Sequence, residues 1–173
     1  MQLEDLKAEY DKLQIKYGAK ELTSIYNGGC TDNPEICFVF MNPTGRNIAS
    51  NPNWKGRRSP WIGTKNIWKL FYRIGLLDEE IYESIMAKKP QEWDEKFADL
   101  VYENVKEHKY FITNLGKCTQ CRKQSFSKNI EGKEYKVYPV YYPIGNGMMN
   151  IDKAIEDIKF IIETNKKEVI NIE

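Results

Sequence analysis

The sequence predicts an α/β domain built around a small, mostly parallel sheet. Three short apolar runs, at 36–41, 110–113 and 135–142, are rich in residues that favour strands. Stretches in which apolar residues recur every three or four positions lie before, between and after these runs, and indicate helices. Strands that alternate with helices are typical of βαβ units, whose strands run parallel. The 173 residues suit one domain, so we interpret 1–173 as a single unit.

Helices are expected in four regions of the chain. An amphipathic helix opens the sequence at 3–17. Thr64 is placed to cap a second helix, and acidic helical stretches follow over 78–108. Asn150 is placed to cap a last helix with an isoleucine-rich stripe, and the apolar residues at 169–172 predict a short terminal strand.

The ends of the predicted strands indicate where a ligand binds. The run at 36–41 is unbroken, which suits a strand buried on both faces, and we expect Cys37 to be buried within it. This run stops at Asn-Pro-Thr-Gly over 42–45, the second at Asn114 and the third at Tyr-Pro-Ile-Gly over 142–145. Ligands bind beyond the carboxyl ends of parallel strands, so these segments are expected to meet in one crevice.

The charges are unevenly distributed, although the formal net charge is only +1. Residues 44–77 contain no acid, acids dominate 78–107, and the segment after Leu115 is basic again. Two basic loops on a nearly neutral protein favour one local anionic partner. The other interpretation is that solubilising charges happen to cluster there.

The cysteines give no complete metal site. Cys118 and Cys121 have the spacing of metal ligands, but the chain has only one such pair. Zinc and iron–sulfur sites usually take four ligands, and the single histidine, His108, lies in a charged helical stretch. We therefore expect no metal, iron–sulfur cluster or other cofactor.

No apolar run approaches the roughly 20 residues that a membrane-spanning helix needs. The charged N-terminal segment does not have the pattern of a secretory signal. We expect a cytoplasmic protein that does not contact a membrane and acts as a monomer.

Four segments resemble motifs of the uracil-DNA glycosylase superfamily. Phe-Met-Asn-Pro-Thr-Gly at 40–45 resembles the Asn-Pro-Gly motif of its mismatch-specific and single-strand-selective branches. Ser-Pro-Trp-Ile-Gly at 59–63 resembles the Pro-Phe-Val-Gly segment of the thermostable branch, and Asn-Ile-Trp-Lys-Leu at 66–70 resembles a helix start of the mismatch-specific branch. Phe-Ile-Thr-Asn-Leu-Gly-Lys-Cys at 111–118 resembles the Ile-Thr-Asn-Val-Val-Lys-Cys stretch of the thermostable branch. The resemblance covers roughly 36–162.

The resemblance implies a three-layer αβα sandwich and a DNA glycosylase that removes uracil or another deaminated base in base excision repair. Such chemistry requires the base to be flipped out of the helix and held. Trp61 would stack on the base, Asn114 would read its Watson–Crick edge, and Asn42 would position the attacking water. Phe40 and Gly45 would complete the base site.

The remaining roles concern the leaving base and the DNA backbone. The family's final motif is His-Pro-Ser or Asn-Pro-Ser, whereas this chain has Tyr-Pro-Ile-Gly-Asn-Gly at 142–147, so Tyr142 or Asn146 would assist the leaving base. Backbone phosphates would be held by a set of basic residues: Arg57, Arg58, Lys65, Lys117, Arg122 and Lys123.

Other interpretations remain open. Asn42 could belong to an ordinary turn, Trp61 could fill the core, and Asn114 could cap a backbone group. The run at 135–142 could be an inner strand, with 169–172 the outer one and the final motif lost. The altered final motif also admits a non-catalytic DNA- or nucleotide-binding module that retains the fold, or an enzyme that acts on free nucleosides.

Overall fold

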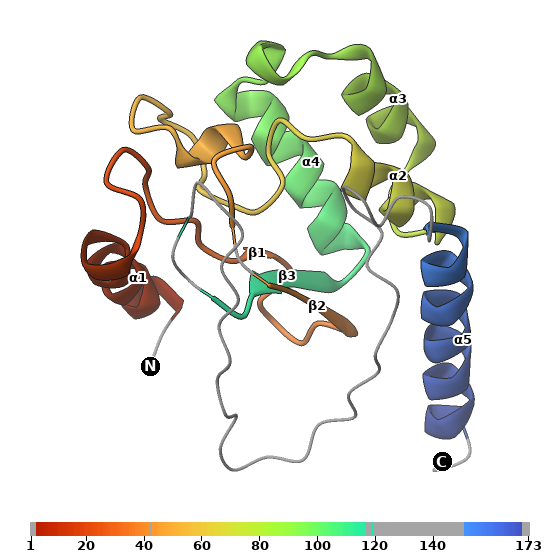
Figure 1. Ribbon diagram of the computed structural model, residues 1–173. Coiled ribbons are helices and arrows are strands. Elements are labelled where there is room, and N and C mark those ends of the chain that lie inside the picture. Colours follow the sequence, from red (N-terminus) through yellow and green to blue (C-terminus); the bar gives the residue numbers. More distant parts are fainter. Residues whose placement is uncertain (1–2, 42, 117–118, 120–150, 171–173) are drawn as a thin grey trace.

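The computed structural model describes residues 3–41, 43–116, 119 and 151–170 (Figure 1). The described helices and strands are, in chain order, α1 (Leu3–Tyr17), β1 (Gly28–Gly29), β2 (Ile36–Phe40), α2 (Asn66–Arg73), α3 (Glu79–Ala87), α4 (Glu95–Glu107), β3 (Tyr110–Asn114) and α5 (Ile151–Ile170). Two short 3-10 turns lie at Ile48–Ser50 and Pro90–Glu92. The predicted α/β class is confirmed.

The described sheet is mixed rather than purely parallel. Its strand order is β1-β3-β2. β2 runs parallel to β3, from the pair Ile36 and Tyr110 to the pair Phe40 and Asn114. β1 pairs with the other edge of β3 in the antiparallel sense. The parallel relation expected between the runs at 36–41 and 110–113 is confirmed, while the run at 135–142 lies outside the described residues.

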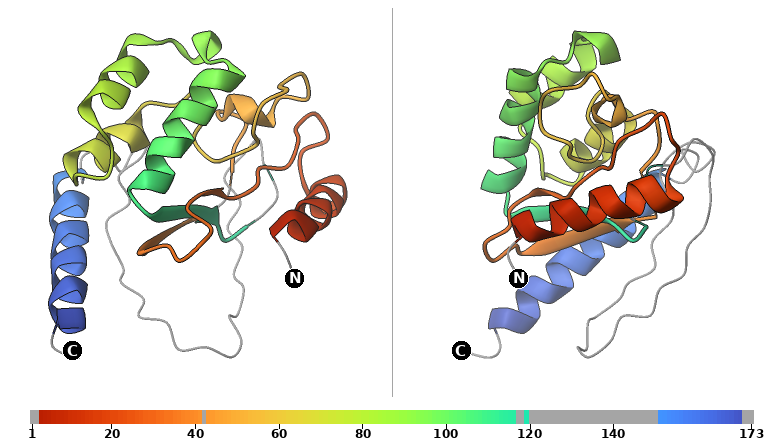
Figure 2. Two further views of the ribbon diagram at one scale, coloured as in Figure 1. Left: turned by 180° about the vertical axis from the view of Figure 1, so that it is seen from behind. Right: turned by 90° about the vertical axis from the view of Figure 1, so that its left-hand side faces the viewer.

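The helices α2, α3 and α4 lie over one face of this sheet in all three views (Figures 1 and 2). On the opposite face Cys37 is exposed and Val39 is 58% exposed. The expectation that β2 is buried on both faces, and Cys37 with it, was therefore wrong. Alternate side chains of a strand point to opposite faces, and only the face beneath the three helices buries its row.

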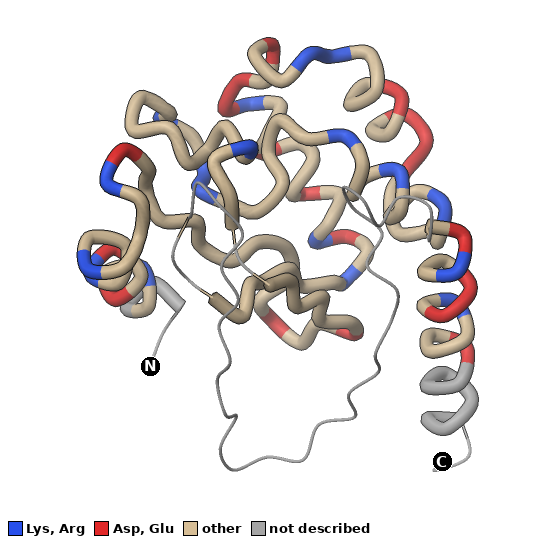
Figure 3. Tube along the Cα trace, viewed as in Figure 1, with Lys and Arg blue, Asp and Glu red and all other residues tan. Residues whose placement is uncertain are grey.

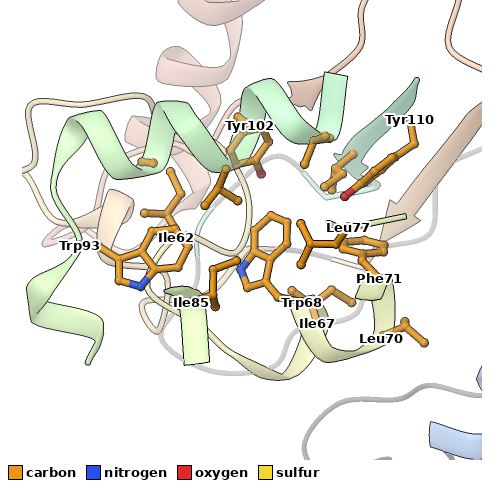
Figure 4. Close-up of a cluster of buried hydrophobic side chains, with 14 of the residues drawn as sticks. Ile62, Ile67, Trp68, Leu70, Phe71, Leu77, Ile85, Trp93, Tyr102 and Tyr110 are labelled. Carbon is orange, nitrogen blue, oxygen red and sulfur yellow. The ribbon is translucent and has the colours of Figure 1, made fainter. Parts of the chain in front are cut away.

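Trp68 of α2 lies at the centre of the hydrophobic core between the sheet and the helices (Figure 4). Its ring is fully buried and lies 5.8 Å from Phe71, 6.0 Å from Tyr102 and 6.5 Å from Trp93, measured between ring centroids. Burying one large apolar side chain contributes on the order of 1.5–3 kcal/mol, so this aromatic cluster is a major source of stability. It holds α2, α4 and the loop before α2 in fixed relative positions.

The short strand β1 was missed by the sequence analysis because its two glycines look like a break. Glycine is a poor strand former, but at this position it permits close packing. A Cβ atom on Gly28 would come within 2.0 Å of the Tyr102 ring. The ring of Tyr102 can therefore lie against the edge of the sheet only because Gly28 has no side chain.

The start of α2 differs from the expectation. Lys65 occupies the N-cap position without a side-chain hydrogen bond, whereas Thr64 donates its hydroxyl to the carbonyl of Trp61 at 2.7 Å. Thr64 is therefore not the cap of α2. Its side chain closes the preceding turn instead, because Ser and Thr hydroxyls compete for nearby backbone groups.

The last helix is longer than expected. Val169 and Ile170 are the final residues of α5, so the strand predicted at 169–172 was wrong for these two residues. The stretch before them contains neither Gly nor Pro, and nothing in it breaks the helix. Residues 171–172 and the expected cap Asn150 lie outside the described residues.

The C-terminus of α2 is closed by a Schellman motif around Gly75. The N–H of Gly75 donates to the carbonyl of Tyr72 at 3.0 Å, and the N–H of Leu76 donates to Phe71 at 2.8 Å. Gly75 has a φ of 78°, the left-handed conformation that this motif requires. A Cβ atom at Gly75 would meet nothing within 4 Å, so only the backbone conformation favours glycine there.

We therefore predict that Gly75→Ala lowers the free energy of unfolding by about 1 kcal/mol, since alanine is strained at positive φ. Gly75→Asn should lose less, because asparagine enters this conformation more readily. Urea denaturation of the three proteins measures both differences. An alanine variant as stable as the parent protein would contradict this account of the helix end.

Candidate functional site

The parallel pairing of β2 and β3 brings two predicted site residues side by side. Phe40 and Asn114 are register partners at the carboxyl ends of the two strands. Register partners project to the same face, and here that face also carries the buried side chains of Tyr110 and Ile112. The pairing extends past the strands, because the N–H of Leu115 donates to the Phe40 carbonyl at 2.7 Å. The two strand ends are therefore held firmly together.

Trp61 joins this pair from the loop that precedes α2. Its ring meets the Phe40 ring edge to face, with centroids 4.9 Å apart and planes at 76°. Both rings are half-buried at the margin of the core. Phe40 thus neighbours both Trp61 and Asn114. Three residues predicted to contact one base are gathered at the same end of the sheet.

Asn114 places an amide side chain at the end of the buried row of β3 side chains, without a hydrogen-bond partner among the described residues. Asn114 is only 4% exposed, and no hydrogen bond to its side chain occurs within the described part of the chain. Leaving a buried amide unpaired costs about 1–3 kcal/mol, so such groups are usually satisfied by protein, water or ligand. The interpretation of Asn114 as a cap for a backbone group finds no such group among these residues.

The backbone of Trp61 is held in a conformation that bulky residues avoid. Its φ is 66°, in the left-handed region, at a cost on the order of 1–3 kcal/mol. The Trp61 carbonyl accepts hydrogen bonds from the Thr64 hydroxyl and, at 3.1 Å, from the Trp68 indole. The indole N–H of Trp61 is buried and has no partner within the described residues. Strained, unpartnered groups of this kind are often found at binding sites.

The rest of the loop is fastened to the core by buried side chains. Tyr102 of α4 donates its hydroxyl to the carbonyl of Pro60 at 2.5 Å, and burial of this phenol raises its pKa above the ordinary value. Asn47 donates to the carbonyl of Ser59 at 2.8 Å and accepts from the N–H of Ala49 at 3.0 Å. The sequence analysis missed Tyr102 and Asn47, whose roles depend on contacts between distant segments.

Gly45 and Asn42 are less informative. Gly45 is exposed and lines a cavity of about 310 Å³ together with Leu22 and Asn47. A Cβ atom at Gly45 would meet only Leu22 within 4 Å among the described residues. Asn42, Tyr142 and Asn146 lie outside the described residues, so their roles stay predictions.

Three of the six residues expected to hold phosphates are described, and each already contacts another part of the protein. Arg57 lies over the Tyr102 ring at 4.5 Å and forms a 3.5 Å ion pair with Asp99. Arg58 forms a 3.6 Å ion pair with Asp11. Lys65 donates to the Met86 carbonyl at 2.5 Å. Lys117, Arg122 and Lys123 lie outside the described residues.

The distribution of charge follows the pattern seen in the sequence. Acidic residues gather along α3 and near the start of α4, whereas the loop before α2 carries only basic ones (Figure 3). Within the described residues no group of three or more His, Cys, Asp or Glu side chains could hold a metal ion. Cys118 and Cys121 lie outside them. In the same part of the chain, no helix combines the length and apolar character needed to cross a bilayer.

Comparison with protein-family models, with curated proteins and with solved structures finds no match to this chain. The case for a function therefore rests on the chemistry of its own residues and on the motifs described above.

The strain at Trp61 leads to a prediction. Trp61→Gly should be more stable than Trp61→Ala by about 1 kcal/mol, because only glycine adopts a φ of this sign without penalty. Trp54, which is also half-buried but has no positive φ, serves as the control, and there the alanine variant should be the more stable one. Denaturant unfolding of the four variants measures both differences. The same order of stability at both positions would show that Trp61 is not strained.

Proposed function

We propose that this protein is a DNA glycosylase that hydrolyses the N-glycosidic bond of uracil or another deaminated base, such as hypoxanthine. The observation that carries the proposal is the cluster of Phe40, Trp61 and Asn114 at the carboxyl ends of two parallel strands. These residues belong to three of the segments that resemble glycosylase motifs. Their location agrees with the rule that ligands bind beyond the carboxyl ends of parallel strands.

The Asn114 amide supplies the base-reading chemistry that the proposal needs. An amide presents a donor and an acceptor side by side, which matches the O4 and N3–H groups of uracil. Asn114 is only 4% exposed and has no side-chain hydrogen bond among the described residues, so a base that pairs with its amide would supply hydrogen bonds that this part of the chain does not. Loss of these hydrogen bonds would penalise a base with a different edge.

The aromatic residues supply a stacking surface. Trp61 and Phe40 meet edge to face, and the half-buried state of each ring leaves part of it accessible. Stacking of a base on an aromatic ring contributes about 1–3 kcal/mol, enough to offset the cost of extruding a mispaired base. The strained backbone that fixes Trp61 would keep this surface preorganised.

Asn42 is proposed to orient the attacking water. A neutral amide is a poor general base, so the reaction must be largely dissociative, with the sugar becoming oxocarbenium-like as the base departs as an anion. The water then needs orientation more than deprotonation. Tyr142 or Asn146 is proposed to donate a hydrogen bond to the departing base, the role of the histidine in the resembled family. We also propose that the domain is a three-layer αβα sandwich. A second layer of helices would then cover the face of the sheet opposite α2, α3 and α4.

The proposal is tested by incubating the protein with end-labelled oligonucleotides that contain uracil or hypoxanthine, single- and double-stranded, and then with alkali. Cleavage at the modified base is expected, with no cleavage of a cytosine control, whose Watson–Crick edge differs. Intact strands for every substrate would reject the glycosylase function.

Substitution of the two amides should separate chemistry from folding. We predict that Asn114→Ala lowers kcat/KM at least about a hundredfold, the order of effect seen when one preorganised hydrogen-bonding group is removed. Asn42→Ala should abolish cleavage. Asn53→Ala, which removes an exposed amide from the adjacent loop, is the matched control and should retain full activity. Thermal unfolding confirms that each variant is folded. An Asn114→Ala variant as active as the Asn53→Ala control would contradict the assigned role.

One observation favours a second candidate, a non-catalytic DNA- or nucleotide-binding module. The only histidine of the chain, His108, contacts Asp78 at 2.9 Å, where the end of α4 meets the start of α3. It is therefore occupied and cannot replace the missing histidine of the final motif. This candidate predicts DNA binding without cleavage, with the logarithm of the affinity falling linearly with the logarithm of the salt concentration.

A further inference from the structure

A second cavity is lined in part by residues 56–59 of the loop that carries Trp61. It has a volume of about 350 Å³, within the roughly 300–1,000 Å³ range of ligand pockets. Its walls come from α1, from β1 and the segments flanking it, and from the loop at 56–59. None of Phe40, Trp61 and Asn114 lines it. It is therefore distinct from the base site.

The lining of this cavity suits an anion. Three cations, Lys7, Arg57 and Arg58, reach it, and the described residues that line it include no carboxylate. Tyr10 and Tyr26 add hydroxyl groups, and Thr31 lies at its margin as an exposed residue. A concave surface lined by positive charges concentrates the electrostatic field inside it, which attracts a negatively charged ligand.

The two arginines retain most of their hydrogen-bonding capacity. A guanidinium has five N–H donors. Among the described residues the Arg57 side chain forms no hydrogen bond, and its Nε is buried without a partner. Arg58 donates one hydrogen bond, to the Tyr26 hydroxyl at 3.4 Å. Their ion pairs with Asp99 and Asp11 are long, at 3.5 and 3.6 Å, and involve partly exposed carboxylates, so they stabilise little.

The arginines are nevertheless well positioned. Arg57 lies over the buried ring of Tyr102 at 4.5 Å, which fixes the plane of its guanidinium. Arg58 and Lys7 each lie 5.8 Å from the centroid of the Tyr26 ring. The Tyr26 hydroxyl in turn donates to Asp11 at 3.1 Å. Oriented guanidinium groups with unused donors match the tetrahedral oxygens of a phosphate, which they can bind bidentately.

We propose that this cavity binds the phosphate group of a nucleotide through Arg57, Arg58 and Lys7. The same chemistry would accept a phosphodiester of a DNA strand or a free 5′-mononucleotide. The inference rests on the proposed function only where it names DNA as the source, since phosphate binding requires no glycosidic cleavage. It assigns Arg57 and Arg58 to a concave pocket rather than to a flat basic surface.

Calorimetric titration tests this inference with four probes: inorganic phosphate, thymidine 5′-monophosphate, thymidine and a short oligothymidylate. None contains a deaminated base, so a failure of cleavage does not affect the result. Thymidine 5′-monophosphate or the oligothymidylate should bind, and thymidine, which lacks phosphate, should not. Binding of the oligothymidylate alone identifies DNA as the source, and binding of the mononucleotide alone identifies the free nucleotide.

A negative charge introduced at the margin of the cavity tests most directly whether the cavity binds an anion. Thr31→Glu introduces a carboxylate at an exposed position that can fold normally, and should weaken binding at least about tenfold through like-charge repulsion. Thr31→Gln is the matched neutral control and should bind like the parent protein. Arg58→Gln should also weaken binding, whereas Lys55→Gln, which removes a neighbouring charge outside the lining, should not.

Three results would overturn the inference. They are equal binding of thymidine and its monophosphate, absence of binding by every phosphate probe at millimolar concentration, and equal affinities of the Thr31→Glu and Thr31→Gln variants.

Discussion

The parallel pairing of β2 with β3 is the constraint on which the candidate site depends. Its register sets Phe40 beside Asn114, and a shift by one residue would turn one of these side chains to the exposed face. The register is fixed by the apolar rows beneath α2 and α4, where the Phe38 ring contacts Phe71 and Tyr110. The hydrophobic core thus contributes to stability and also determines that Asn114 is the polar side chain at the end of the buried side chains of β3.

Aromatic side chains of the core also fix the position of the loop that carries Trp61. Trp68 donates to the Trp61 carbonyl, and Tyr102 donates to the neighbouring Pro60 carbonyl, so two buried rings hold the loop at adjacent residues. Tyr102 also contacts Arg57, which lines the second cavity. One buried tyrosine therefore helps to position both candidate sites. This explains how a long polar loop holds the strained backbone of Trp61 in place.

The sequence pattern predicted the α/β class, the strand at 110–113 with Asn114 at its end, and the adjacent ends of the first two predicted strands. The sequence pattern did not predict the features that depend on contacts between distant segments of the chain. Gly28 lies in a strand at a position where the Tyr102 ring occupies the space that a side chain would fill, and no local sequence pattern shows this contact. Cys37 is exposed because helices cover the other face of β2, and periodicity within a wholly apolar run cannot reveal this. The cavity around Lys7 and Tyr26 joins segments far apart in the chain, so only the folded structure reveals it.

The proposed function depends most on the Asn114 amide, which we propose binds the extruded base. Side-chain amide NMR tests it directly, with an oligonucleotide whose 2′-fluoro-deoxyuridine resists cleavage and with Asn114→Asp to assign the signal. We expect the Asn114 amide resonances to shift with this oligonucleotide and not with the matching cytidine strand, while those of Asn53 stay unchanged. Resonances that respond to neither strand, or equally to both, would contradict it.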